Sequence, residues 1–175
     1  MQSVTRLITH FKPEHYSLSL DINRAERTFS GTVSINGESS SDTVVLHAKD
    51  LTITSATIDG HEATWRMTEN DEVVFSCERI MPGNHIVVVG FSGSISDSMH
   101  GMYPAYYDYD GKKHELIATQ FESHHAREVF PCVDEPEAKA TFDVTLTTEP
   151  GVTVLGNMPI KHQTTDNERL VTTFD

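Results

Sequence analysis

Apolar and polar residues alternate along most of this chain, which is the period-two pattern of half-buried strands. Residues 16–22 place apolar side chains at every second position, and residues 29–35 repeat this pattern after a polar turn. The two runs therefore predict a β-hairpin with one buried face.

Shorter segments continue this strand signal toward the C-terminus. Because residues 86–91 are almost continuously apolar, we expect that segment to be a strand buried on both faces. No stretch has a sustained helical period, so the fold class is predicted to be all-β, with mostly antiparallel sheets in a saddle-shaped or sandwich arrangement. Further strands are predicted at Val44–Ala48, Leu51–Ile58, Ala63–Met67, Val73–Cys77, Ile86–Phe91, Leu116–Phe121, Phe142–Thr147, Val152–Leu155 and Leu170–Phe174.

Two segments depart from the alternation. Residues 92–111 are rich in Gly, Ser, Tyr and Asp, and we expect a long ordered loop there that ends in an Asp110-Gly111 turn. Residues 123–138 contain Pro131 and Pro136, which cannot donate to a sheet ladder, so an irregular loop is predicted.

The size and charge of the chain narrow its possible partners. Its 175 residues predict a single domain, 1–175, and its formal net charge of −13 disfavours nucleic acid as a partner. No apolar run is long enough for a membrane span, and the N-terminus does not have the pattern of a signal peptide. Cys77 and Cys132 are far apart in sequence, so we expect free thiols and a cytoplasmic location. The last predicted strand runs to the end of the chain, which suggests a piece of a longer protein.

Ten histidines invite a search for metal ligands. The zinc-protease motif H-E-x-x-H needs two histidines four residues apart on a helix, and neither His61-Glu62 nor His114-Glu115 is followed by that second histidine. The pair His124-His125, with Asp134 and Glu135 nearby, could supply ligands. Adjacent residues on an extended chain point to opposite faces, however, and exposed loop histidines are the simpler interpretation.

Cys132 could in principle act as a nucleophile with His124 or His125 as its base. Its apolar neighbours favour a buried structural thiol instead. Arg127 lies close enough in sequence to Asp134 or Glu135 to form an ion pair that would fix the loop.

The stretch ATQFESHHAREVFPCVDEPEAKATF, residues 118–142, resembles the N-terminal domain of the aminopeptidase N type zinc metallopeptidases, the family that includes puromycin-sensitive aminopeptidase. The match is gap-free and specific, and weaker similarity extends in order over most of the chain. His124-His125 depart from the family, which often has Thr-Asp there.

The resemblance implies a substrate-binding role for Gln120 and Glu122, which would recognise the free α-amino group of a peptide. It also implies a cis peptide bond at Glu122-Ser123. We assign Arg127, Asp134, Glu135 and Lys139 to shaping the loop. A carboxylate suits such recognition because an ammonium group gains a charge-assisted hydrogen bond that an internal amide does not.

The family's zinc-binding helix and catalytic tyrosine belong to a thermolysin-like domain, which is expected downstream of this chain. The resemblance therefore implies no catalytic residue and no metal or other cofactor within the chain itself, and zinc in the full-length enzyme. Its expected partners are that catalytic domain and peptide N-termini, with no nucleic acid and no membrane. Two alternatives remain: a freestanding β-sandwich module that binds through its tyrosine-rich segment Met102–Tyr109, and a small metal or thiol hydrolase.

Overall fold

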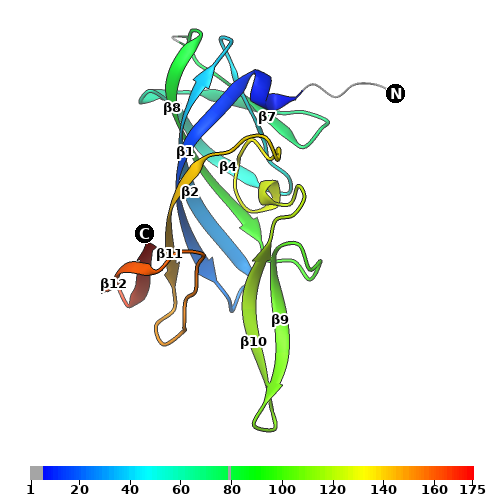
Figure 1. Cartoon of the computed structure of the whole chain (residues 1–175), viewed down its shortest axis with the longest axis vertical. Coiled ribbons are helices and arrows are strands. Elements are labelled where there is room, and N and C mark those ends of the chain that lie inside the picture. Colours follow the sequence, from blue (N-terminus) through cyan, green and yellow to red (C-terminus); the bar gives the residue numbers. More distant parts are fainter. Residues whose placement is uncertain (1–5, 79) are drawn as a thin grey trace.

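The computed structural model describes residues 6–78 and 80–175, and within them the chain is almost entirely β (Figure 1). Thirteen strands are joined by turns, with two 3-10 turns, η1 (Leu7–Thr9) and η2 (Ala126–Glu128). The strands are β1 (Phe11–Asn23), β2 (Thr28–Ser39), β3 (Val44–His47), β4 (Thr52–Ile58), β5 (His61–Glu62), β6 (Thr64–Met67), β7 (Glu72–Ser76), β8 (Gly83–Ser94), β9 (Gly101–Tyr109), β10 (Lys112–Gln120), β11 (Thr141–Thr148), β12 (Ile160–Asp166) and β13 (Arg169–Phe174).

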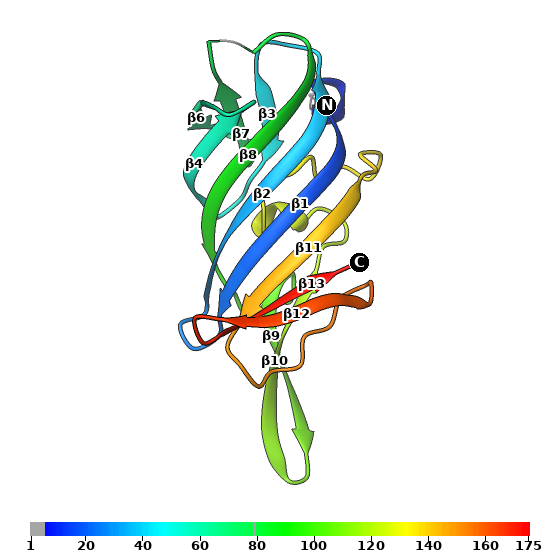
Figure 2. The same ribbon diagram turned by 90° about the vertical axis from the view of Figure 1, so that its left-hand side faces the viewer.

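The strands form three sheets. The largest has eight strands in the order β12-β13-β11-β1-β2-β8-β4-β5, and a smaller one has the order β3-β7-β6. The remaining pair, β9 and β10, forms a two-stranded hairpin that extends away from the body of the molecule in both views (Figures 1 and 2). The β1–β11 pair is parallel and the other strand pairs are antiparallel, so the all-β prediction is confirmed.

One hydrophobic core joins the two larger sheets and the irregular segment that follows β10. The predicted hairpin is β1–β2, whose alternation places one set of side chains in this core. Gly31 lies where β2 approaches its neighbours closely: a Cβ there would be 2.6 Å from the Ser19 carbonyl oxygen and 2.9 Å from the Phe91 ring. Buried core side chains include Tyr16, Leu18, Leu20, Val33, Ile35, Leu46, Phe75, Val87, Val89, Phe91, Phe130 and Val133.

The predicted long loop at 92–111 is wrong. Strand β8 continues to Ser94 and β9 occupies 101–109, so only residues 95–100 and the turn at 110–111 lie outside strands in this region. The Asp110-Gly111 turn is confirmed, with positive φ at both residues, and it joins β9 to β10. The tyrosine-rich segment is therefore a strand. Its outer half is exposed, so burial leaves no alternating pattern in the sequence that would reveal it.

Two strand predictions also need correction. Residues 152–155 form no strand, because β11 already pairs with β1 on one side and β13 on the other, which leaves no free edge. Strand β8 is not buried on both faces: Ile86 is 51% exposed, whereas Val87, Val89 and Phe91 point into the core. The irregular segment predicted at 123–138 is confirmed; besides turns it contains the η2 3-10 turn and one isolated bridge at Cys132, and no strand.

Candidate functional site

Gln120 and Glu122, the two residues assigned to substrate binding, lie at the end of β10: Gln120 is its last residue, and Glu122 lies two residues farther along the chain. Gln120 pairs with Gly101 of β9, and its side-chain Oε1 accepts a hydrogen bond of 3.0 Å from the Glu122 backbone N–H. Both side chains are exposed, and no ion pair involves the Glu122 carboxylate among residues 6–78 and 80–175. The Glu122-Ser123 peptide bond is cis, as the resemblance implies. The site thus presents an available carboxylate directly after a strand.

The residues that follow, 121–140, we call the anchored segment, because backbone and side-chain contacts hold it although it is not sheet. Arg127 Nε donates to Asp134 Oδ2 at 3.1 Å, and the Arg127 backbone N–H donates to the same oxygen at 3.3 Å. Arg127 Nη2 also donates to the Asp134 carbonyl oxygen at 3.2 Å. Arg127 thus pairs with Asp134 and not with Glu135, and both side chains are nearly buried.

Glu135 holds the other end of the segment. Its carboxylate accepts hydrogen bonds from the backbone N–H groups of Leu7 at 2.6 Å and Ile8 at 3.2 Å. These donors open η1, where backbone N–H groups have no partner within the helix, so a carboxylate satisfies them well. Lys139 is exposed, and its ammonium group forms no ion pair within the described residues.

The anchored segment also contacts β1 and β3. The Val133 N–H donates to the Tyr16 hydroxyl at 3.1 Å, and the Asp134 N–H donates to His47 Nδ1 at 3.1 Å. His47 and Cys132 exchange two backbone hydrogen bonds of 2.7 and 3.1 Å. Burial lowers the pKa of His47 to about 4, and the Arg127 guanidinium acts in the same direction. His47 is therefore a neutral acceptor at neutral pH.

Cys132 has the surroundings of a structural residue. It is 4% exposed, and burial raises the pKa of its thiol well above the ordinary value. Because the thiolate is the reactive form, this environment opposes nucleophilic chemistry. Its backbone pairs with that of His47, and its side chain belongs to the hydrophobic core.

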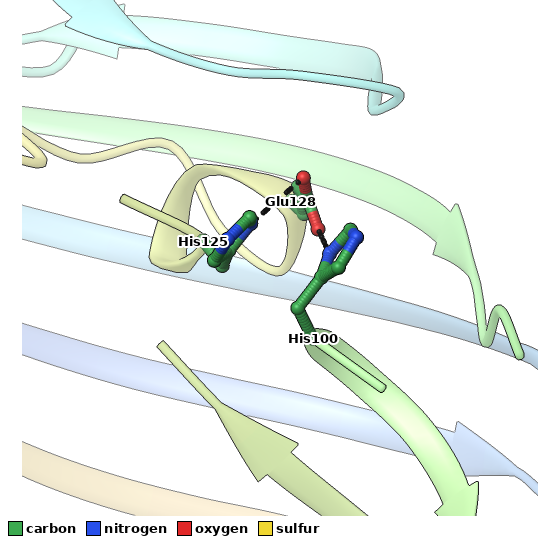
Figure 3. Close-up of side chains that lie close together, drawn as sticks. All are labelled: His100, His125 and Glu128. Atoms are coloured by element: carbon green, nitrogen blue, oxygen red, sulfur yellow. Dashed lines mark hydrogen bonds and ion pairs between the residues drawn. The ribbon is translucent and has the colours of Figure 1, made fainter. Parts of the chain in front are cut away.

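Two histidines and one glutamate form a cluster: His125 and Glu128 belong to the anchored segment, and His100 directly precedes β9 (Figure 3). His100 Nδ1 is 2.6 Å from Glu128 Oε2, and His125 Nδ1 is 3.2 Å from Glu128 Oε1. Lys49 Nζ donates to Oε1 at 3.0 Å. Burial acts to raise the pKa of Glu128, but the hydrogen bonds from Lys49 and the two imidazoles hold that pKa below its usual range.

Sequence reasoning considered His125 but missed His100 and Glu128. His125 and Glu128 are three residues apart, which places them on one side of the η2 turn. His100 comes from the stretch predicted as loop, and no spacing rule connects it with the other two. The group that sequence reasoning considered, His124-His125 with Asp134 and Glu135, does not form in the described part of the chain, because Asp134 and Glu135 bind Arg127 and η1.

The H-E-x-x-H motif of zinc peptidases has no counterpart here. His61-Glu62 forms strand β5, and His114-Glu115 lies within strand β10. The sequence therefore does not contain that set of zinc ligands. Across residues 6–78 and 80–175, no helix has the length and apolar character needed to cross a membrane.

Comparison with known proteins identifies the family. Residues 12–175 match the model of the peptidase M1 N-terminal domain. The chain is 49% identical to an aminopeptidase N of Lactococcus lactis subsp. lactis over 176 aligned residues, covering 99% of this chain and 21% of that protein. An aminopeptidase N of Lactobacillus delbrueckii subsp. lactis is 46% identical over 90% of this chain and 19% of its own length.

A plant relative is more distant: aminopeptidase M1 of Arabidopsis thaliana is 35% identical over 86% of this chain and 19% of its own length. This chain thus spans about a fifth of the length of these relatives. The matched region covers nearly all of the described residues, including Gln120, Glu122 and the anchored segment. The chain belongs to the family of peptidase M1 N-terminal domains.

Proposed function

We propose that this chain is the substrate-lining, non-catalytic N-terminal domain of a zinc-dependent aminopeptidase that removes N-terminal residues from peptides. The observation that carries this proposal is the exposed Glu122 carboxylate, which follows β10 directly and has Gln120 beside it. The anchored segment supports the role because Arg127, Asp134 and Glu135 fix the chain immediately after the carboxylate. The long M1 relatives supply the context of a downstream catalytic domain.

The proposed chemistry is recognition of a charged amine. A peptide N-terminus carries an ammonium group, which would pair with Glu122, and the Gln120 amide would add a neutral hydrogen-bonding group. An internal peptide amide gives the carboxylate no such charged partner. Glu122 would therefore select free N-termini, while zinc and the catalytic groups would come from the downstream thermolysin-like domain.

Exposure determines what the chain can do alone. Two opposite charges 4 Å apart gain about 4 kcal/mol at an effective dielectric constant near 20, but an exposed pair gains only about 0–1 kcal/mol. Because Glu122 is exposed here, we expect the 175-residue chain to bind amino acids or peptides too weakly to measure and to hydrolyse no peptide. Strong recognition would require a further domain that covers the carboxylate. The predicted cytoplasmic location stays a prediction.

The test is a pair of substitutions in the full-length aminopeptidase. Glu122→Ala is expected to lower kcat/KM for a dipeptide substrate about 30- to 1000-fold, or about 2–4 kcal/mol, because the substrate ammonium loses its partner. Glu137→Gln is the matched control: Glu137 is exposed, lies in the anchored segment and pairs with Arg6, so activity should be unchanged. An unchanged kcat/KM in Glu122→Ala, with zinc content intact, would refute the role of Glu122.

A further inference from the structure

The cluster of His100, His125 and Glu128 shares no residue with the proposed substrate site, which consists of Gln120 and Glu122. Each residue offers one ligand atom, and these three atoms all lie within 4.8 Å of one another. His100 comes from the residues just before β9, whereas His125 and Glu128 come from the η2 turn. Figure 3 shows both imidazole rings directed at the two oxygens of one carboxylate.

The chemistry of this donor set favours a borderline transition-metal ion. Two imidazoles and one carboxylate are ligands that zinc accepts, in sites that leave a fourth position open to water. Hard ions such as Mg²⁺ and Ca²⁺ prefer sets composed of oxygen ligands. We propose that His100, His125 and Glu128 bind one Zn²⁺ or a similar divalent transition-metal ion.

Only a small local movement of the side chains would bring the three ligand atoms onto one ion. Zinc ligands lie about 2.0–2.2 Å from the metal, which in a tetrahedron places ligand atoms roughly 3.3 Å apart. The distance of 3.2 Å between His125 Nδ1 and Glu128 Oε1 is already close to this value. The distance of 2.6 Å between His100 Nδ1 and Glu128 Oε2 is that of a short hydrogen bond and must lengthen when an ion binds. The imidazole rings stack with centroids 4.1 Å apart, so one ring must turn to bring both nitrogens onto one ion. The His100 side chain is 36% exposed, so it has room for this rotation.

A metal ion could bind by replacing the protons that now lie between the imidazole rings and the Glu128 carboxylate. In the metal-free cluster, imidazole N–H groups bridge to the Glu128 oxygens, and a bound ion would replace these protons with coordination bonds. Lys49 is a built-in competitor because its ammonium also binds Oε1 at 3.0 Å. Because Lys49 donates to Oε1 whereas Oε2 faces His100, Oε2 is the expected ligand.

The position suggests a structural effect. The ion would join the residues before β9 to the η2 turn, which follows Glu122 in the chain. His125 is also fixed by its backbone N–H, which donates to the Phe121 carbonyl oxygen at 3.0 Å. Bound metal would therefore hold the anchored segment in place against the start of the hairpin. Because the ion binds the folded chain, the melting temperature should rise with zinc concentration.

The experiment is calorimetric titration of the untagged 175-residue chain with Zn²⁺, together with Co²⁺ as a spectroscopic probe. We expect one saturable zinc site and cobalt absorption bands typical of low coordination number. His100→Ala, His125→Ala and Glu128→Gln should each weaken zinc binding at least about tenfold. Excess Mg²⁺ should not displace the ion.

Two further variants separate this site from adventitious binding. His124→Ala is the matched control, because His124 is the exposed neighbour of His125 and stacks against it without belonging to the three-ligand group. It should leave the affinity unchanged. Lys49→Met should tighten binding, because it removes the competing cation, whereas a purely structural role for the cluster predicts no such gain.

Any of three results would overturn the proposal: no saturable zinc binding by the folded chain, an equal loss in His124→Ala and His125→Ala, or unchanged affinity in Lys49→Met. Circular dichroism of each variant shows whether it is folded. If His100→Ala does not fold, His100→Gln gives the same test with less loss of volume.

Discussion

The hairpin β9–β10 and the anchored segment are consecutive in the chain but differ in how they are held. The hairpin is regular, with nine paired positions from Lys112–Tyr109 to Gln120–Gly101, yet its outer half is mostly exposed and its strands pair only with each other. The anchored segment has almost no regular structure, yet Val129, Phe130, Cys132 and Val133 are at most 5% exposed. Regular strand pairing and burial against the core are therefore separate properties: the hairpin has the first and the anchored segment has the second. Glu122 lies where these two regions meet.

The buried ion pair gives the largest expected effect. In Arg127→Met, Asp134 loses the guanidinium that holds it, and breaking such a pair leaves a poorly solvated charge. We expect the free energy of unfolding to fall by about 3–5 kcal/mol. Urea denaturation measured by circular dichroism would test this value.

The matched control is Arg27→Met, at an ion pair between the β1–β2 turn and the hairpin. Arg27 pairs with Glu115 of β10, and both side chains are about one-third exposed, so a much smaller loss is expected. The double variant Arg127→Met/Asp134→Leu should recover part of the lost stability, because it removes the unpaired charge as well. Equal losses at Arg127 and Arg27 would show that the anchored segment is not held more strongly than the hairpin.

Acid sensitivity gives the second largest effect. His47 has a pKa of about 4 in the folded state, largely through burial, whereas an unfolded histidine titrates near 6.5. Between these values the unfolded chain binds the proton, so stability falls as pH decreases from about 6.5 to about 4. We expect a loss of about 2–3 kcal/mol from this residue, measured as the free energy of unfolding against pH.

His47→Asn should flatten this slope, because an amide oxygen can accept the Asp134 N–H without titrating. His85 acts in the opposite sense: burial opposes its protonation, but hydrogen bonds to Asp59 and the Met81 carbonyl raise its pKa. Its stabilisation is complete below the unfolded pKa and is lost as pH rises through the folded pKa. The parent protein and the His47→Asn variant both contain His85. Its contribution therefore cancels when the pH dependence of one is subtracted from that of the other. An unchanged slope would contradict the role assigned to His47.

A smaller effect is expected where the anchored segment meets β1. Tyr16→Phe removes the hydroxyl that accepts the Val133 N–H and leaves that backbone group buried without a partner. The expected cost is about 1–2 kcal/mol in the free energy of unfolding. The amide of Val133 should also exchange faster with deuterium than in the parent protein, and unchanged exchange would show that this bond does not hold the segment.

The same contrast explains which features the sequence could predict. Strands β1 and β2 bury one face, so Tyr16, Leu18 and Val33 reveal them through alternation. Strand β12 has no buried residue, and the outer half of β9 is exposed, so neither leaves a hydrophobic pattern. The family motif led to Gln120, Glu122 and the cis bond that follows Glu122. The contact between His100 and Glu128 depends on how two distant segments pack, which no local pattern encodes.

The smallest expected effect concerns the exposed part of the hairpin. Tyr109 is 70% exposed and lies next to the Asp110-Gly111 turn, where its ring reaches only the edge of His114. Tyr109→Ser should change the free energy of unfolding by no more than about 0.5 kcal/mol, because it removes little buried surface. Hydrogen exchange should likewise be faster in the outer half of β9 and β10 than at Val133. If Tyr109→Ser lowered the free energy of unfolding as much as Tyr16→Phe, strand pairing would hold the hairpin as firmly as burial holds the anchored segment.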